Sequence, residues 1–226
     1  KIEIATTGNA TDFGDASSVH NPNGGSAMSS STRGVYNLGH TPSIVSTIDY
    51  VIISSDGGAS DFGELTVAKK ETNRLSNATR GLIFGGTITP ETNVIEFITI
   101  ASTGNGTGFG SLLQAARGMG GVGNATRGLI GSGYNGSSFI NTIEFVTITT
   151  GGDSEDFGDL SAAKMNTAAV GSSTRAVFGG GYTFLLITDR KELDKQIYGT
   201  FAGVGAVKDK ESRATGGAHL KELLKT

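Results

Sequence analysis

The sequence predicts a mainly β protein built from four consecutive copies of one repeat of 47–48 residues. Three markers recur with this period. The first is the arginine of a Thr-Arg dipeptide, at Arg33, Arg80, Arg127 and Arg175. The second is a Phe-Gly dipeptide, at Phe13, Phe62, Phe109 and Phe157, and the third is an acidic residue after an isoleucine, at Glu3, Asp49, Glu96 and Glu144. We therefore interpret residues 1–182 as one repeat domain and residues 183–226 as a separate tail.

Each repeat has the pattern of several short β-strands. "TIEFVTITT" alternates with period two and is rich in β-branched and aromatic residues, which predicts a strand packed on both faces. "GGDSEDFGDL" follows as a polar, glycine-containing turn that leads into another strand. The 36 glycines, beside only 3 prolines, indicate many tight turns. Four short strands in about 48 residues are typical of a propeller blade.

The order of these pieces resembles a Kelch-type blade, in which "RAVFGG", "TIEFVTI" and "FGDLSAAK" take the places of successive strands. Phe-Gly stands where Kelch repeats usually have Trp, and this chain has no Trp. "ITIASTGNGTGFGSL" and "TRGLIFGG" also resemble repeats of virion structural proteins of tailed bacteriophages. The resemblance covers residues 1–182 and implies a Kelch-like β-propeller of about four blades.

The two ends of the repeat domain predict how the propeller closes. We expect "KIEIATT" at the N-terminus to pair with "TRAVFGGG" of the last repeat and so complete the fourth blade, because closure removes exposed sheet edges. In an alternative arrangement the tail strand "FLLIT" takes that place, and the N-terminal strand becomes an open edge that recruits another chain. The repeats could also belong to a larger or shared ring.

The tail differs from the repeats in composition. Its pattern predicts a strand at 184–188, a helix near 190–202 that begins after Asp189, and a second helix around 211–225. "FLLITDRKELDKQIYGTF" resembles the motor domain of the restriction subunit of type I restriction enzymes. A motor requires a phosphate-binding loop with a lysine, and "FGGGYT" precedes the tail instead. The tail is therefore not expected to hydrolyse ATP.

The repeated charges suggest structural ion pairs. A carboxylate in a strand packed on both faces is costly to desolvate unless it is paired. We therefore expect each repeated arginine to bind a carboxylate of its own or a neighbouring blade, with a channel-lining ligand site as the alternative. The residues concerned are Arg33, Arg80, Arg127 and Arg175 with Glu3, Asp49, Glu96 and Glu144.

A second set of basic residues follows the Phe-Gly turns and is the candidate ligand-binding set. We expect these side chains to be exposed and able to bind an acidic glycan, or else simply to be solvated. They are His20, Lys69, Arg117 and Lys164.

No metal, cofactor or catalytic set is expected. The acidic turns contain Asp56, Asp61, Asp153 and Asp156, but their spacing does not match known calcium-binding loops. The chain has no Cys, and its three histidines, His20, His40 and His219, lack thiolate partners.

The resemblance to virion proteins implies a non-enzymatic virion structural or host-recognition module, which we expect in the virion or outside the cell. Its expected partners are other virion proteins, a host-surface glycan, or a second copy bound through an open blade edge. The net charge of −3 gives no reason to expect nucleic acid binding, and no apolar run is long enough to span a bilayer. The alternatives are a surface or secreted adhesin, a glycan-acting enzyme, and an inactive remnant of the restriction motor.

Overall fold

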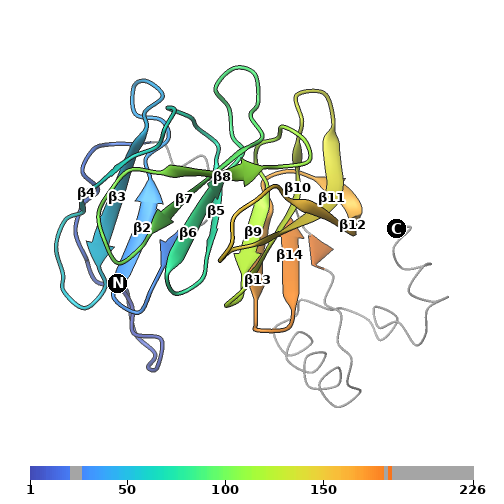
Figure 1. The fold of residues 1–226 in the computed structure, drawn as a ribbon. Coiled ribbons are helices and arrows are strands. Elements are labelled where there is room, and N and C mark those ends of the chain that lie inside the picture. Colours follow the sequence, from blue (N-terminus) through green and yellow to red (C-terminus); the bar gives the residue numbers. More distant parts are fainter. Residues whose placement is uncertain (21–26, 181–182, 185–226) are drawn as a thin grey trace, which may run out of the picture. The chain divides into compact units, whose positions relative to one another are not determined.

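The computed structural model describes residues 1–20, 27–180 and 183–184. The chain divides into two units, Lys1–Phe184 and Leu185–Thr226, and every described residue belongs to the first. Antiparallel strands form four sheets in this unit, as Figure 1 shows. The prediction of a mainly β fold is confirmed.

Three of the sheets have four strands each, joined in chain order as a meander. The first contains β1 (Met28–Ser29), β2 (Arg33–Asn37), β3 (Thr47–Ile52) and β4 (Ser60–Glu64). The second contains β5 (Asn73–Ser76), β6 (Arg80–Phe84), β7 (Val94–Thr99) and β8 (Thr107–Ser111). The third contains β9 (Gly120–Gly123), β10 (Arg127–Tyr134), β11 (Phe139–Thr147) and β12 (Glu155–Lys164). The fourth has three described strands, β13 (Ala168–Gly171), β14 (Ala176–Gly180) and β15 (Thr183–Phe184).

Each sequence repeat supplies one sheet. In the first three sheets the second strand begins at the repeated arginine, the third strand carries the repeated carboxylate, and the fourth contains the Phe-Gly dipeptide. The first strand of each sheet contacts the first strand of the next, from β1 to β5, β9 and β13. The apolar side chains between sheets form two buried clusters, one around Leu82, Phe84 and Ile130 and the other around Val35 and Ile48.

The predicted pairing of the N-terminus with β14 is wrong. β14 lies between β13 and β15, with Gly179 opposite Phe184, so both of its edges are used by the segments that precede and follow it in the chain. Residues 1–12 are exposed and form no strand. Only two residues separate β14 from β15 in the sequence, so pairing these strands closes a very short loop. Pairing β14 with the N-terminus would close a loop that contains the whole repeat domain, which costs more conformational entropy. Thr183 and Phe184, with which the tail begins, lie at this edge, and the rest of "FLLIT" lies outside the described residues.

The N-terminal segment packs against the first sheet instead. The carbonyls of Phe13 and Asp15 accept hydrogen bonds from the N–H groups of Gly57 (2.8 Å) and Ala59 (2.7 Å), in the loop before β4. The segment thus stands in the place of the fourth strand of a preceding sheet. The predicted helices near 190–202 and around 211–225, and the end of the predicted strand 184–188, lie outside the described residues. Among those described, no helix could cross a membrane.

Candidate functional site: polar contacts between neighbouring sheets

The residue three places before each repeated arginine closes a turn. The Oδ1 atom of Asn77 accepts hydrogen bonds from the N–H groups of Thr79 (2.9 Å) and Arg80 (2.7 Å). Asn124, Ser30 and Ser172 make the same closure in their repeats. The side-chain amide of Asn77 also donates to the carbonyl of Ala125, in the matching turn of the next repeat (3.0 Å). The Asn-Ala-Thr-Arg motif therefore forms a tight turn and also links neighbouring sheets.

The repeated arginines and carboxylates lie on opposite faces of their sheets. Arg80 is opposite Thr99 across the β6–β7 pair, whereas Glu96 is opposite Ile83. The two positions differ by an odd number of residues in the ladder, so their side chains point to opposite faces. Equivalent registers hold in the first and third sheets. Strand register therefore excludes the predicted pairs within one sheet, which are Arg33 with Asp49, Arg80 with Glu96 and Arg127 with Glu144. Glu3 is exposed.

The arginines pack on aromatic rings instead. The guanidinium carbons of Arg33, Arg80 and Arg127 lie 4.7, 4.7 and 4.5 Å from the ring centroids of Tyr50, Phe97 and Phe145. Each ring immediately follows the repeated carboxylate in sequence, and so lies on the arginine's face. Arg80 also donates to the carbonyls of Ile148 (3.1 Å) and Thr149 (2.9 Å), which belong to the next repeat. Arg33 donates to Ile100 in the same way (3.2 Å).

Replacing Arg80 by Ala is expected to cost more stability than replacing Arg127 by Ala. Arg127 would lose its ring contact, worth about 0.5–1 kcal/mol at an exposed site. Arg80 would lose the same kind of contact and its hydrogen bonds to the next sheet, which adds about 1.5–3 kcal/mol for a charged donor. Urea unfolding of both variants measures the difference, and equal losses would contradict a linking role for Arg80.

The repeated carboxylates join consecutive repeats from the buried face. Asp49, Glu96 and Glu144 are 0, 1 and 3% exposed. They accept hydrogen bonds from backbone N–H groups of the preceding repeat, at a position four residues after the Phe of each Phe-Gly dipeptide. The N–H of Ser17 donates to Asp49 (3.0 Å), that of Thr66 to Glu96 (2.7 Å) and that of Leu113 to Glu144 (3.0 Å). The repeated carboxylate thus makes the same hydrogen bond to the preceding repeat in each of the three sheets.

Lys69 is buried, and the prediction that it is exposed is wrong. Its Nζ lies 2.7 Å from Oε2 of Glu96, and each side chain is 1% exposed. Burial alone would raise the pKa of Glu96, but Lys69 and the hydrogen bonds from Thr66 outweigh it and hold this pKa below its usual value. The lysine follows Phe62 by seven residues and enters the junction with the next sheet, so it binds the carboxylate there rather than extending into solvent.

Among the described residues, the equivalent carboxylate of the third sheet has no such cation beside it. Seven residues after Phe109 stands Ala116. Glu144 is bound by the hydroxyl of Ser154 (2.5 Å) and by Leu113. Burial raises its pKa above the usual range, and these hydrogen bonds only partly oppose that effect.

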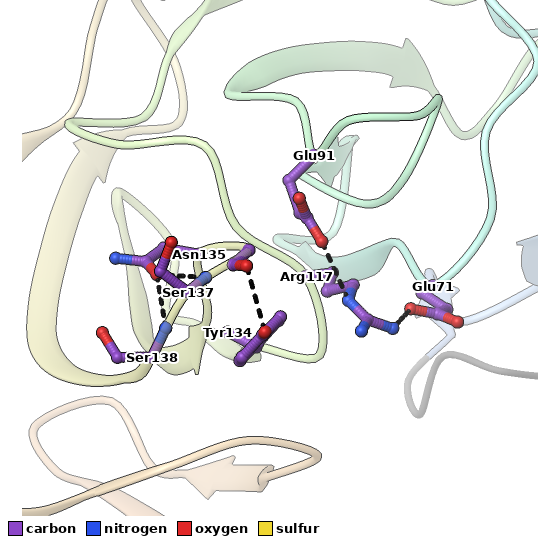
Figure 2. A network of polar contacts seen from close by, with 8 residues as sticks. Glu71, Glu91, Arg117, Tyr134, Asn135, Ser137 and Ser138 are labelled. Atoms are coloured by element: carbon purple, nitrogen blue, oxygen red, sulfur yellow. Dashed lines mark hydrogen bonds and ion pairs between the residues drawn. The ribbon is translucent and has the colours of Figure 1, made fainter.

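Arg117 is held between two carboxylates, as Figure 2 shows. It forms an ion pair with Glu71, and its Nε lies 3.1 Å from Oε1 of Glu91. The hydrogen bond that Arg117 donates to the carboxylate of Glu71 raises the pKa of Arg117 above its usual value. The guanidinium carbon also lies 5.1 Å from the ring centroid of Tyr134, whose hydroxyl donates to the carbonyl of Gly136 (3.0 Å). With 28% of its side chain exposed, Arg117 remains partly accessible to a ligand.

The other two residues of the predicted ligand-binding set are also engaged. Lys164 donates to the carbonyl of Gly180 (3.0 Å). The ring of His20 stacks on Tyr36 with centroids 6.1 Å apart, and its Nδ1 lies 3.2 Å from the carbonyl oxygen of Ser18. Each of the four residues thus makes its contacts at a different place along the row of sheets.

A buried cluster between the first two sheets was not foreseen from the sequence. Arg74 donates through Nε to Oδ1 of Asn37 (2.6 Å) and through Nη2 to the backbone carbonyl of Asn37 (3.0 Å). The hydroxyl of Thr72 donates to the same Oδ1 (3.1 Å). Burial lowers the pKa of Arg74 to about 10. The only signal was a polar Asn37 at the end of β2, where the next repeat has Phe84.

Most acidic side chains of these turns accept hydrogen bonds from backbone N–H groups. Asp61 and Asp156 accept hydrogen bonds from the N–H groups of Gly63 and Gly158 (3.1 Å each), and Asp153 accepts one from Ser111 (2.8 Å). Asp56 binds Lys1 (2.5 Å). Over the part of the chain that the structure describes, no three His, Cys, Asp or Glu side chains gather in a way that could hold a metal ion.

The chain matches no protein-family model and no curated protein.

Proposed function

We propose that this chain is a non-enzymatic structural or host-recognition module of a tailed-bacteriophage virion, and that its sheets are the blades of a Kelch-like β-propeller. The resemblance of the repeats to virion proteins supports the first part. The contacts of β1 with β5, β5 with β9 and β9 with β13 support the second, because the innermost strands of successive propeller blades lie side by side around an axis.

One observation carries the non-enzymatic assignment. The residues best suited to acid–base chemistry, the carboxylates Asp49, Glu96 and Glu144, are buried and hydrogen-bonded to the preceding repeat. A general acid or base must reach the proton that it transfers, so it needs contact with substrate. These carboxylates instead stabilise the stacking of sheets, which is the property required of a rigid structural module.

The partners proposed for the module are other virion proteins or a host-surface glycan. Arg117 is the member of the basic set best placed for an acidic sugar, because its guanidinium lies at the surface beside the ring of Tyr134. Aromatic faces and fixed guanidinium groups are common elements of polar ligand sites. The carboxylates of Glu71 and Glu91 compete for the same guanidinium and would have to be displaced or shared.

The proposal is tested by mass spectrometry of purified virions from a phage that encodes this sequence. Peptides of the chain should be present in amounts comparable to those of other structural proteins. Their recovery only from the host cell envelope would favour the adhesin alternative, and their absence from virions would overturn the proposal. Binding of the full chain to an array of bacterial polysaccharides, compared with the Arg117→Ala variant, then separates host recognition from a purely structural role.

A further inference from the structure

Three successive junctions between repeats in the described structure use the same backbone docking. The loop before the fourth strand of one sheet donates two N–H groups to the fourth strand of the preceding sheet. The acceptors are the carbonyl of the Phe in the Phe-Gly dipeptide and the carbonyl two residues later. The donors Gly57, Gly104 and Gly152 bind Phe13, Phe62 and Phe109 at 2.8, 2.8 and 2.9 Å, and Ala59, Gly106 and Ser154 bind Asp15, Glu64 and Ser111 at 2.7, 2.8 and 2.9 Å.

The glycine of the Phe-Gly dipeptide makes room for this loop. A Cβ atom placed on Gly14, Gly63 or Gly110 would lie 2.3, 2.5 or 2.1 Å from the carbonyl oxygen of the docked loop. These distances are too short for any side chain, so the repeated glycine is explained by the close approach of a neighbouring backbone. We call the Phe-Gly strand the socket and the loop that docks on it the plug.

The socket of the third sheet is empty of described residues. A Cβ atom on Gly158 would meet nothing within 4 Å. Phe157 is 51% exposed, whereas the equivalent Phe62 and Phe109 are 2 and 8% exposed. The site has the sequence and backbone of the other sockets, since Gly158 has a φ of +134° and Gly63 one of +147°.

The N-terminus carries a plug without a socket. Gly8, Asn9 and Ala10 precede Phe13 at the same spacing at which Gly104, Asn105 and Gly106 precede Phe109. Residues 1–12 are exposed. Ile2 and Ile4 are 64 and 98% exposed, although Ile95, the equivalent of Ile2, is 0% exposed in its junction.

We propose that the N-terminal plug of one chain docks on the empty Phe157–Gly158 socket of a second copy, so that chains assemble head to tail. The N–H groups of Gly8 and Ala10 then donate to the carbonyls of Phe157 and Asp159. The side chain of Asn9 accepts from the N–H of Asp159, as that of Asn105 accepts from Glu64 (3.0 Å). The surface buried continues the interface that already joins the repeats within one chain.

A second copy fits better than the same chain. Phe13 and Asp15 fix the plug to the first sheet through Gly57 and Ala59. The socket lies on β12 of the third sheet, with the second sheet between them in Figure 1. Five residues from Gly8 to Phe13 span at most about 18 Å, which limits how far the plug can move from its own first sheet. A contact between two different surfaces propagates from copy to copy and gives a ring or a filament.

A disulfide trap tests this docking, because the chain contains no Cys of its own. The test variant combines Asn9→Cys with Asp159→Cys, and the matched control combines Glu64→Cys with Asn105→Cys, the equivalent positions of an internal junction. All four residues are exposed, so the substitutions should be tolerated. Under mild oxidation the control should cross-link within one chain, and the test variant should form dimers and a ladder of larger species.

Two outcomes would overturn the proposal. A test variant that cross-links only within the monomer shows that the chain closes on itself, and one that stays uncross-linked while the control reacts shows that this socket binds something else or nothing. Mixing the two single variants, Asn9→Cys and Asp159→Cys, should give only a heterodimer, which distinguishes plug and socket from accidental thiol pairing. None of these results depends on a glycan or on a virion, so they stand apart from the proposed function.

Gly158→Ala provides a second measurement. Its added methyl group meets none of the described residues within 4 Å but would collide with a docked plug. Sedimentation of the full chain should show self-association at least about tenfold weaker than in wild type, corresponding to about 1.4 kcal/mol. Unchanged association in this variant would also contradict the docking.

Discussion

Glu96→Gln is expected to lower the free energy of unfolding by about 3–5 kcal/mol, because it leaves the charge of Lys69 buried without a partner. The two side chains are 1% exposed and 2.7 Å apart, so water cannot replace the lost carboxylate. Burial already lowers the pKa of Lys69, and without Glu96 that lysine must either stay charged at high cost or lose its proton. Urea unfolding at neutral pH measures the loss.

Glu144→Gln is the matched control. This carboxylate occupies the same position in the next repeat but has no cation beside it among the described residues, and burial raises its pKa. Glutamine keeps an acceptor for the N–H of Leu113 and removes a buried charge. We therefore expect its free energy of unfolding at neutral pH to equal or exceed that of wild type. Equal destabilisation by the two substitutions would contradict the role of Lys69.

The two carboxylates also predict opposite pH dependence. The pKa of Glu96 is lowered in the folded chain, so its contribution to stability is present above the unfolded value of about 4.3 and is lost as the pH falls through the folded pKa. The pKa of Glu144 is raised, so its contribution is present below the unfolded value and is lost as the pH rises through the folded pKa. Unfolding of wild type and both variants between about pH 3 and pH 8 should show the Glu96→Gln difference shrinking in acid.

Gly63→Ala is the second substitution with a large expected effect. The new methyl group would lie 2.5 Å from the carbonyl oxygen of Gly104, and this neighbour is backbone that cannot rotate away. Overpacking of this kind costs about 1–3 kcal/mol or more, and the positive φ of Gly63 adds strain of about 1–3 kcal/mol. The total is comparable to the whole stability of many domains.

Gly158→Ala separates the two causes. Gly158 shares the positive φ, but no described residue lies within 4 Å of the added methyl group. At low protein concentration, where chains are monomeric, it should lose only the strain contribution. Thermal unfolding should therefore show Gly63→Ala to be less stable than Gly158→Ala by about 2 kcal/mol. Similar losses would mean that backbone strain, rather than docking of the next repeat, explains why glycine is repeated after each of these phenylalanines.

The order of strands was determined by the sequence alone. A period of 47–48 residues, alternation in "TIEFVTI" and glycine at the turns are local properties, and each repeat forms its sheet from its own segment. The position of the arginine at the start of a strand was predictable for the same reason. So was the burial of the carboxylates, because their strand has the pattern of one that is packed on both faces.

Only the tertiary structure decided which charged groups meet. Strand register places Arg80 and Glu96 on opposite faces, and the packing of the next sheet then brings Lys69 to Glu96 from another repeat. It also decided that β15, rather than the N-terminus, lies beside β14. Sequence periodicity specifies which face of its own sheet a residue occupies. A contact between two sheets depends on how their surfaces pack against each other. The periodic pattern of one chain does not determine that packing.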